Sequence, residues 1–272
     1  MRYDEIQPSP QLARYIKCFW VLESPAADSP GQQRILPDGC MEVVFNLADP
    51  FRQFNDDGTA QRQPLVLLIG QMRRFMLIEP TGNVRILGIR FWPGGAYPFI
   101  TLPQHELADN AISLDYLWGG IVREIESKMR DTRTVPELVT LIEKVLLARL
   151  NRFRAHDETV FAAVGLISRA GGVLSIENLA DEMGMSLRQL DRRFNSWVGL
   201  SPKALCRIVR LNRLLKMIER NGDGPEWVRL ALECGYYDQS HFIKDFRAFA
   251  GKEPTAYFSE TNVMSEHFTL TS

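Results

Sequence analysis

Apolar positions recur at helical spacing twice between Ser175 and Phe258, in the same order each time. The first copy opens with a short apolar face that ends at a glycine, made of Ile176, Leu179, Ala180, Met183 and Gly184. The second copy opens in the same way, with Trp227, Leu230, Ala231, Cys234 and Gly235. Spacing of i, i+3, i+4 and i+7 predicts one buried face of a helix, and glycine predicts its end. A pattern that occurs twice indicates a duplicated structural unit.

Each glycine is followed by a second helical pattern. Its apolar side is predicted to be Leu187, Leu190 and Phe194 in the first copy, and Phe242 and Phe246 in the second. A glycine and a proline then close each copy, at positions 199 and 202 and again at 251 and 254. Helix, glycine turn and helix are the outline of a helix-turn-helix, whose second helix enters the DNA major groove. The alternative is a pair of helical hairpins without a DNA-binding role.

The opposite sides of the two second helices carry groups suited to DNA. These residues are Arg188, Asp191 and Arg192 in the first copy, and Gln239, Ser240, His241 and Lys244 in the second. Arg and Lys bind guanine edges or phosphates, whereas Gln, Ser and His bind base edges or the backbone. A carboxylate can accept a hydrogen bond from cytosine N4. The pattern therefore favours two DNA-reading helices over plain hairpins.

The doubled motif resembles the DNA-binding domain of AraC-type transcriptional regulators. The resemblance is carried by residues 176–184, 186–194 and 199–202 in the first copy, and by 231–236, 238–246 and 251–254 in the second. It implies two helix-turn-helix units joined by a central helix from residue 202 to about 220, and base-facing positions for the seven residues named above. Two residues depart from the family pattern. Leu214 stands where a small residue is usual in the central helix, and Asp191 stands where a polar or basic contact is commoner.

The N-terminal part of the chain has short apolar runs separated by turn residues. The runs are residues 16–22, 35–36, 41–47, 65–69, 75–78 and 84–92. They predict an antiparallel β sandwich or small barrel, which can hold one small ligand. The family resemblance implies a cupin-like effector-binding domain in the same place. These runs contain no histidine, so the cupin set of metal ligands is missing, and we expect neither a metal nor another cofactor.

Four residues in or next to these strands are candidates for effector binding. Trp20, Glu42, Arg90 and Trp92 are charged or polar-tipped side chains within apolar runs. A binding pocket combines apolar walls with a few such orienting groups. The alternative for each residue is an ordinary place in the core or on the surface.

From Ser113 onward the pattern becomes helical. Apolar residues keep helical spacing over about 114–125 and again over 138–146, and the polar stretch 151–158 is the best candidate for a linker. The two helices could form a dimer interface or pack against the barrel. We therefore expect an α+β chain: a β-rich effector-sensing domain (1–112), a helical region (113–154), an all-α domain with two helix-turn-helix motifs (155–260) and a tail (261–272). Each half is expected to close a core of its own.

Charge and cysteine content narrow the function. The chain of 272 residues has a net charge of −1, which argues against indiscriminate coating of nucleic acid. Between Ser186 and Arg220, however, nine residues are Lys or Arg and two are acidic. Four cysteines lie far apart and show neither disulfide nor zinc spacing. No leader peptide or membrane span is visible in the sequence, so a cytoplasmic location is expected.

The leading interpretation is a sequence-specific transcription regulator controlled by a small molecule bound in the N-terminal domain. Its expected partners are a double-stranded DNA operator, the effector, RNA polymerase if it is an activator, and a second copy of the chain in a homodimer. The alternative is an N-terminal enzyme tethered to DNA, for instance a cysteine-dependent alkyl-transfer protein using Cys18 or Cys40. Neither cysteine has a sequence neighbour suited to activate a thiolate, which argues against the enzyme.

Overall fold

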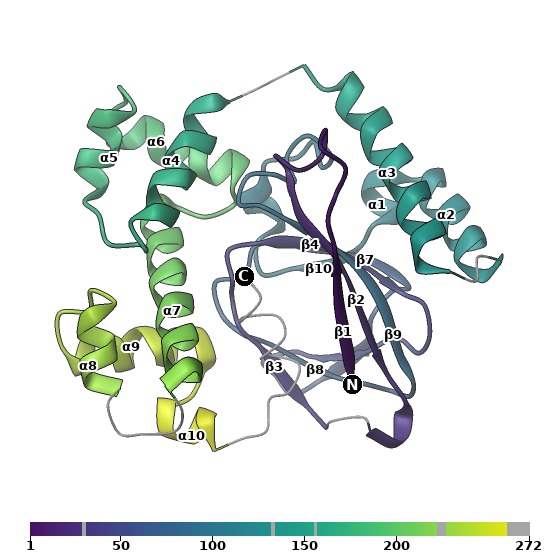
Figure 1. Ribbon diagram of the computed structural model, residues 1–272, viewed down its shortest axis with the longest axis horizontal. Coiled ribbons are helices and arrows are strands. Elements are labelled where there is room, and N and C mark those ends of the chain that lie inside the picture. Colours follow the sequence, from purple (N-terminus) through teal and green to yellow (C-terminus); the bar gives the residue numbers. More distant parts are fainter. Residues whose placement is uncertain (29–30, 132–133, 155–156, 222–226, 260–272) are drawn as a thin grey trace.

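The structure is a computed structural model that describes the chain except residues 29–30, 132–133, 155–156, 222–226 and 260–272, and side chains are not described at 130–131, 219–221 and 227–228. The expected tail, 261–272, lies outside the described residues. Figure 1 shows a β-rich N-terminal body with helices α1 to α3 on one side and helices α4 to α10 on the other.

The strands among the described residues form two antiparallel sheets. The larger sheet has the order β1 (Arg2–Ile6), β2 (Ile16–Ser24), β9 (Val84–Phe91), β4 (Met41–Asn46), β7 (Val66–Ile69) and β10 (Ala111–Ser113). The smaller sheet has the order β3 (Gln33–Ile35), β8 (Met76–Glu79), β5 (Arg52–Phe54) and β6 (Ala60–Arg62). The predicted antiparallel N-terminal fold is confirmed.

The long central strands bury both of their faces. Because side chains alternate along a strand, the even-numbered residues of β2, such as Cys18 and Trp20, pack with Ile78 of the smaller sheet. The odd-numbered residues, such as Phe19, face the other way and pack with Leu138 and Ile142. Leu138 and Ile142 belong to α3 (Val135–Arg152). This helix lies beside α1 (Asp115–Trp118) and α2 (Gly120–Asp131). Of the two roles considered for residues 113–154, packing against the barrel is therefore observed.

The C-terminal helices follow the predicted repeat. They are α4 (Glu158–Arg169), α5 (Ile176–Glu182), α6 (Leu187–Trp197), α7 (Pro202–Asn221), α8 (Trp227–Glu233), α9 (Gln239–Ala250) and α10 (Pro254–Phe258). Side-chain caps fix the starts of both second helices: Ser186 and Gln189 form a capping box on α6, and Asp238 Oδ1 accepts from the His241 amide at 2.7 Å on α9. The predicted central helix corresponds to α7.

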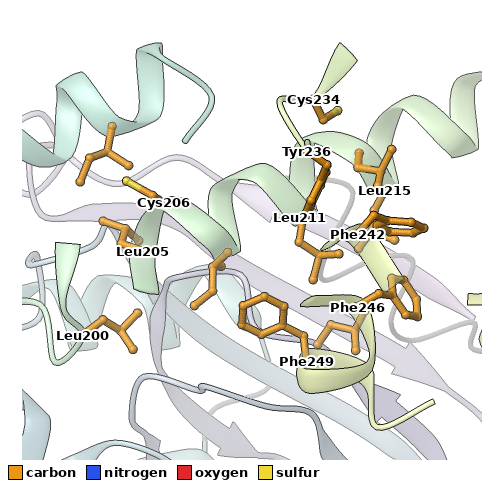
Figure 2. Packing of buried hydrophobic residues seen from close by; sticks show 14 of the residues in the cluster. Leu200, Leu205, Cys206, Leu211, Leu215, Cys234, Tyr236, Phe242, Phe246 and Phe249 are labelled. Carbon is orange, nitrogen blue, oxygen red and sulfur yellow. The ribbon is translucent and has the colours of Figure 1, made fainter. Parts of the chain in front are cut away.

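Apolar side chains from both copies of the motif meet around α7. Figure 2 shows Leu211 and Leu215 of α7 in one cluster with Phe242 and Phe246 of α9. Leu190 and Phe194 of α6 are buried in the same core, as predicted. Leu187 is not: its side chain is 48% exposed, because it is the first residue of α6 and lies beyond the side chains that this helix buries. The prediction was wrong for this residue.

The two halves of the molecule share buried side chains. Leu36, between β3 and β4, lies in the core of the C-terminal helices, and Tyr97 stacks on Trp197 of α6 with 4.2 Å between ring centroids. The Phe75 amide donates to the Phe249 carbonyl of α9 at 2.7 Å. Short apolar segments of the N-terminal body therefore extend the C-terminal core, and the expectation that each half closes a core of its own stays a prediction.

Candidate nucleic-acid interface

The first reading helix, α6, separates a buried side from a charged side. Leu190 and Phe194 anchor it in the core, and this places Arg188, Asp191 and Arg192 on the opposite, exposed side. Asp191 does not stand free, because Asn195 Nδ2 donates to its carboxylate at 3.0 Å and to its carbonyl at 2.9 Å. The two arginines are thus the cations that α6 presents to solvent on this side.

Arg193, the neighbouring arginine, has a different environment. Its Nη1 donates to both carboxylate oxygens of Asp157 at 3.1 Å. Asp157 also caps α4 by accepting from the Val160 amide at 3.2 Å. Arg193 therefore connects α6 to the start of α4, which is consistent with its absence from the predicted DNA-facing residues.

The second reading helix, α9, presents its predicted residues in the same way. Phe242 and Phe246 are buried, and Gln239, Ser240 and Lys244 are exposed. His241 is only half exposed: its ring packs edge-on against Tyr236 at 5.3 Å, and its Nδ1 accepts from the Tyr237 amide at 3.4 Å. His241 supports the turn as well as lying on the outward side of the helix.

A partly buried ion pair fixes α9 relative to α7. Arg207 of α7 donates to Asp245 Oδ1 through Nε at 3.0 Å and through Nη2 at 2.7 Å. The same guanidinium lies 4.9 Å from the centre of the Phe249 ring. Asp245 is 4% exposed, so removing Arg207 would leave a carboxylate buried without its partner cation. The outward side of α9 is thus held in a defined orientation.

Two exposed apolar side chains stand at the beginnings of the reading helices. Leu187 opens α6, and Tyr237, which is 87% exposed, precedes the cap of α9. The apolar pattern did not indicate that either side chain is exposed. The turn lengths could have indicated the exposure of Tyr237. Two residues, Tyr236 and Tyr237, separate Gly235 from the cap of α9, whereas one residue, Met185, separates Gly184 from the cap of α6. Apolar groups at such a position can contact thymine methyl groups or sugars.

The effector candidates lie in three different environments. Trp20 is buried between the sheets, with 1% of its surface exposed, and it lies over Gly88, where a Cβ atom would come within 2.0 Å of the indole. Trp92 is 41% exposed, and its Nε1 donates to the Ala13 carbonyl at 3.2 Å. The structure therefore separates the two tryptophans.

Glu42 and Arg90 are brought together as a buried ion pair. They face each other on β4 and β9, with 2.6 Å between Arg90 Nε and Glu42 Oε1, and Asp38 Oδ2 lies 3.7 Å from the same Nε. Burial raises the pKa of the Glu42 carboxyl, and the charge of Arg90 opposes this effect. Burial alone would lower the pKa of Arg90, but Glu42 and Asp38 raise it. The pair occupies the inner side of the larger sheet.

The cysteines lack the properties of a nucleophile. All four are buried. Burial raises the pKa of the Cys18 thiol to about 12 and raises that of Cys40 well above its ordinary value. A reactive cysteine needs the opposite environment, because the thiolate is the attacking species. Nothing in this arrangement supports the cysteine-dependent enzyme.

Two features are absent from the described residues. No helix in this part of the chain is long and apolar enough to cross a bilayer. Nor do three or more His, Cys, Asp or Glu side chains gather here in a way that could hold a metal ion.

Comparison with known proteins identifies the domain family of the C-terminal helices. Residues 179–260 match a family described as a helix-turn-helix domain, and residues 4–113 match a family described as a domain of unknown function, DUF6597. The chain is 28% identical to the HTH-type transcriptional activator RhaS of Escherichia fergusonii over 131 residues, which are 46% of each protein. It is 33% identical to the HTH-type transcriptional regulator MtrA of Neisseria gonorrhoeae over 86 residues, 32% of this chain and 28% of that protein. The chain thus spans less than half the length of these relatives.

The fold and these relatives identify a helix-turn-helix domain at residues 179–260. The predicted resemblance of the C-terminal helices to AraC-type regulators is confirmed. A solved structure of ToxT from Vibrio cholerae is similar over 89% of this chain and 98% of that one, with a TM-score of 0.47 and 12% identity. That likeness is too low to bear on function or ligand.

Proposed function

We propose that the whole chain is a sequence-specific transcription regulator that reads DNA with α6 and α9 and responds to a small-molecule effector. The observation that carries the proposal is the pair of matching outward sides, with Arg188 and Arg192 on one helix and Gln239 and Lys244 on the other. α6 is anchored by Leu190 and Phe194, and α9 by Phe242 and Phe246, so the polar residues on their opposite sides can enter a groove. α7 and the Arg207–Asp245 pair hold the two units in a fixed relation.

The roles within the interface follow from side-chain chemistry. Arg192 can bind guanine O6 and N7 with two hydrogen bonds, and Gln239 can bind adenine in the same manner. Arg188 and Lys244 can contact either bases or phosphates. An operator would therefore have two short specific segments, with phosphate contacts that make binding sensitive to salt.

Alanine substitutions on the two helices test this proposal. Operator DNA is first selected from a random library with the full chain. Arg192→Ala should then weaken binding by on the order of 1–3 kcal/mol and relax selectivity at one base pair. Lys244→Ala should weaken binding and lower the salt dependence by about one counterion if it contacts a phosphate.

Matched controls separate these effects from general charge. Arg123 and Lys128 lie exposed on α2, remote in sequence from both units, and their alanine variants remove the same charges. Both controls should bind like the parent, and melting temperatures should stay unchanged in all four variants. Parent-like binding by Arg192→Ala and Lys244→Ala together would overturn the proposal.

The remaining partners are proposals of the same kind. RNA polymerase is a partner if the regulator activates, and a reporter with the operator upstream of a weak promoter distinguishes activation from repression. A homodimer would occupy two adjacent operators, and analytical ultracentrifugation of the full chain tests it.

A further inference from the structure

We propose that the effector binds in a cleft between the N-terminal body and helices α4 and α7, and that it is a small molecule with one acidic group on an apolar body. This proposal rests on the proposed function, because it places the regulatory ligand of that regulator. It also replaces the site predicted from Trp20, Glu42, Arg90 and Trp92, of which Trp92 lines this cleft.

The cleft has the size of a small-molecule site. Its two walls come from the N-terminal body and from the C-terminal helices. Its volume is about 600 Å³, within the range of known ligand pockets. One wall comes from the N-terminal body and includes Lys17, Asp38 and Trp92, and the other includes Phe161 of α4 and Val209 of α7. The space between the sheets, in contrast, is occupied by Trp20 and its apolar neighbours.

The charge of the lining favours an acidic ligand. Arg14, Lys17, Arg213 and Lys216 line the cleft, and Asp38 is the acidic residue among its described lining residues. Arg14 is paired with Glu158 at the edge of α4. A second cavity of about 620 Å³ beside Phe75 has the opposite balance, because Asp56, Asp57 and Asp109 outnumber its arginines, Arg34 and Arg74. An anion is therefore attracted to the first cavity rather than the second.

The apolar part of the ligand has aromatic and aliphatic walls to pack against. Trp92 is a large side chain left 41% exposed at the cleft, and Lys17 Nζ lies 5.5 Å from the centre of its ring. Phe161 and Val209 stand on the opposite wall. An aromatic or branched apolar body would cover these surfaces while its acidic group lies among the cations.

The position of the cleft explains how the ligand would control DNA binding. α7 connects the two helix-turn-helix units, and the same helix supplies Asn212 and Arg213 to the cleft. A ligand that contacts both walls binds best to one arrangement of the two bodies and so shifts the molecule toward it. That arrangement sets the orientation of α6 and α9.

The test uses a fluorescent anion and its uncharged counterpart on the full chain. 8-Anilinonaphthalene-1-sulfonate carries one acidic group on an apolar body, and N-phenyl-1-naphthylamine is the same skeleton without the acid. Lys17→Gln and Arg213→Gln should each weaken binding of the sulfonate about fivefold to tenfold and leave binding of the neutral compound unchanged. Lys17→Arg, which keeps the charge, should bind like the parent.

Arg74→Gln is the matched control, since it removes one cation from the second cavity. Unchanged sulfonate binding in this variant, with unchanged melting temperatures throughout, supports the cleft. Equal sulfonate affinity in Lys17→Gln, Arg213→Gln and the parent would overturn the proposal, as would a loss confined to Arg74→Gln. Because the readout needs no DNA, these outcomes are independent of the alanine substitutions on α6 and α9.

Discussion

Gly251 ends α9 and at the same time touches the N-terminal body. Its φ of 69° lies in the left-handed region, which glycine adopts without a steric cost. A Cβ atom at this position would lie 2.2 Å from Cε1 of Phe75. One residue thus serves both the helix end and the contact between the two halves of the molecule.

Gly184 offers a matched comparison for Gly251. It has a φ of 63°, and no atom lies within 4 Å of the Cβ position. Gly184→Ala should therefore cost about 1 kcal/mol from backbone strain, whereas Gly251→Ala should cost about 1–3 kcal/mol more from the clash with Phe75. Denaturant unfolding of both variants measures the difference.

Phe75→Ala in the Gly251→Ala background should recover part of that difference, because the ring that clashes is gone. Equal losses of stability in the two glycine variants would contradict a close approach at Phe75.

The buried cysteines give a prediction about reactivity. Because burial raises the pKa of Cys18 to about 12 and that of Cys206 to about 11, almost no thiolate exists in the folded protein at about pH 8. A thiol reagent such as dithionitrobenzoate should react slowly with the native chain and rapidly with all four thiols in denaturant. One fast-reacting thiol in the native chain would instead favour the hypothesis of a cysteine-dependent enzyme.

At the scale of elements, the apolar pattern located the strands rich in apolar residues and missed those that are mainly polar. β2, β4, β7 and β9 follow runs of Val, Ile, Leu and Phe, and all four lie inside the larger sheet. β1 lies at the edge of that sheet, and β5 and β6 are short, largely polar strands of the smaller sheet. A strand without a buried side has no apolar alternation, so sequence alone could not reveal it.

The helical elements show the same dependence on burial. The repeat located α5, α6, α8 and α9, because each buries residues at helical spacing against α7 or its neighbours. One long helix expected after Ser113 is divided into α1 and α2 by Gly119, which has a φ of 59°. The cleft could not be foreseen, because its walls unite residues from Arg14 to Met217 that only folding brings together.

The tandem arrangement of α6 and α9 predicts a fixed operator spacing. Each helix should enter the major groove on the same side of the duplex, so the two protected segments should be centred about 10 bp apart. Insertion of about 5 bp between them should abolish binding, because it moves one segment to the far side. Footprinting and gel-shift titration with inserted operators provide the measurement. Binding that tolerates the half-turn insertion would show that one helix alone reads DNA.

At the scale of the whole molecule, the N-terminal body completes the core of the DNA-binding helices. Trp197 of α6 is 8% exposed, and its ring is covered by Tyr97, Phe153 and Phe161. Two of these three rings precede residue 155, the predicted start of the DNA-binding domain. A fragment that begins there would expose a large aromatic surface on the first reading helix.

This shared core predicts that Trp197 stabilises the full chain more than it stabilises the fragment 155–272. Trp197→Ala should cost the full chain about 3–5 kcal/mol, because it leaves a cavity under Tyr97 and Phe153. The same change should cost the fragment 155–272 markedly less, since its ring is already uncovered there. Thermal and denaturant unfolding of the four proteins gives the comparison. Equal costs in both contexts would mean that the N-terminal body does not stabilise α6.

The N-terminal body holds the C-terminal ends of both reading helices. His105 Nδ1 lies 3.3 Å from the carbonyl of Asn195 in α6, and the Phe75 amide bonds the carbonyl of Phe249 in α9. If the two readers keep this relation on DNA, a duplex that does not match their spacing has to bend to meet them. The energy of that bend depends on the base steps between the two contacted segments, with flexible pyrimidine–purine steps costing least. Operators should then differ in affinity through base pairs that no side chain touches.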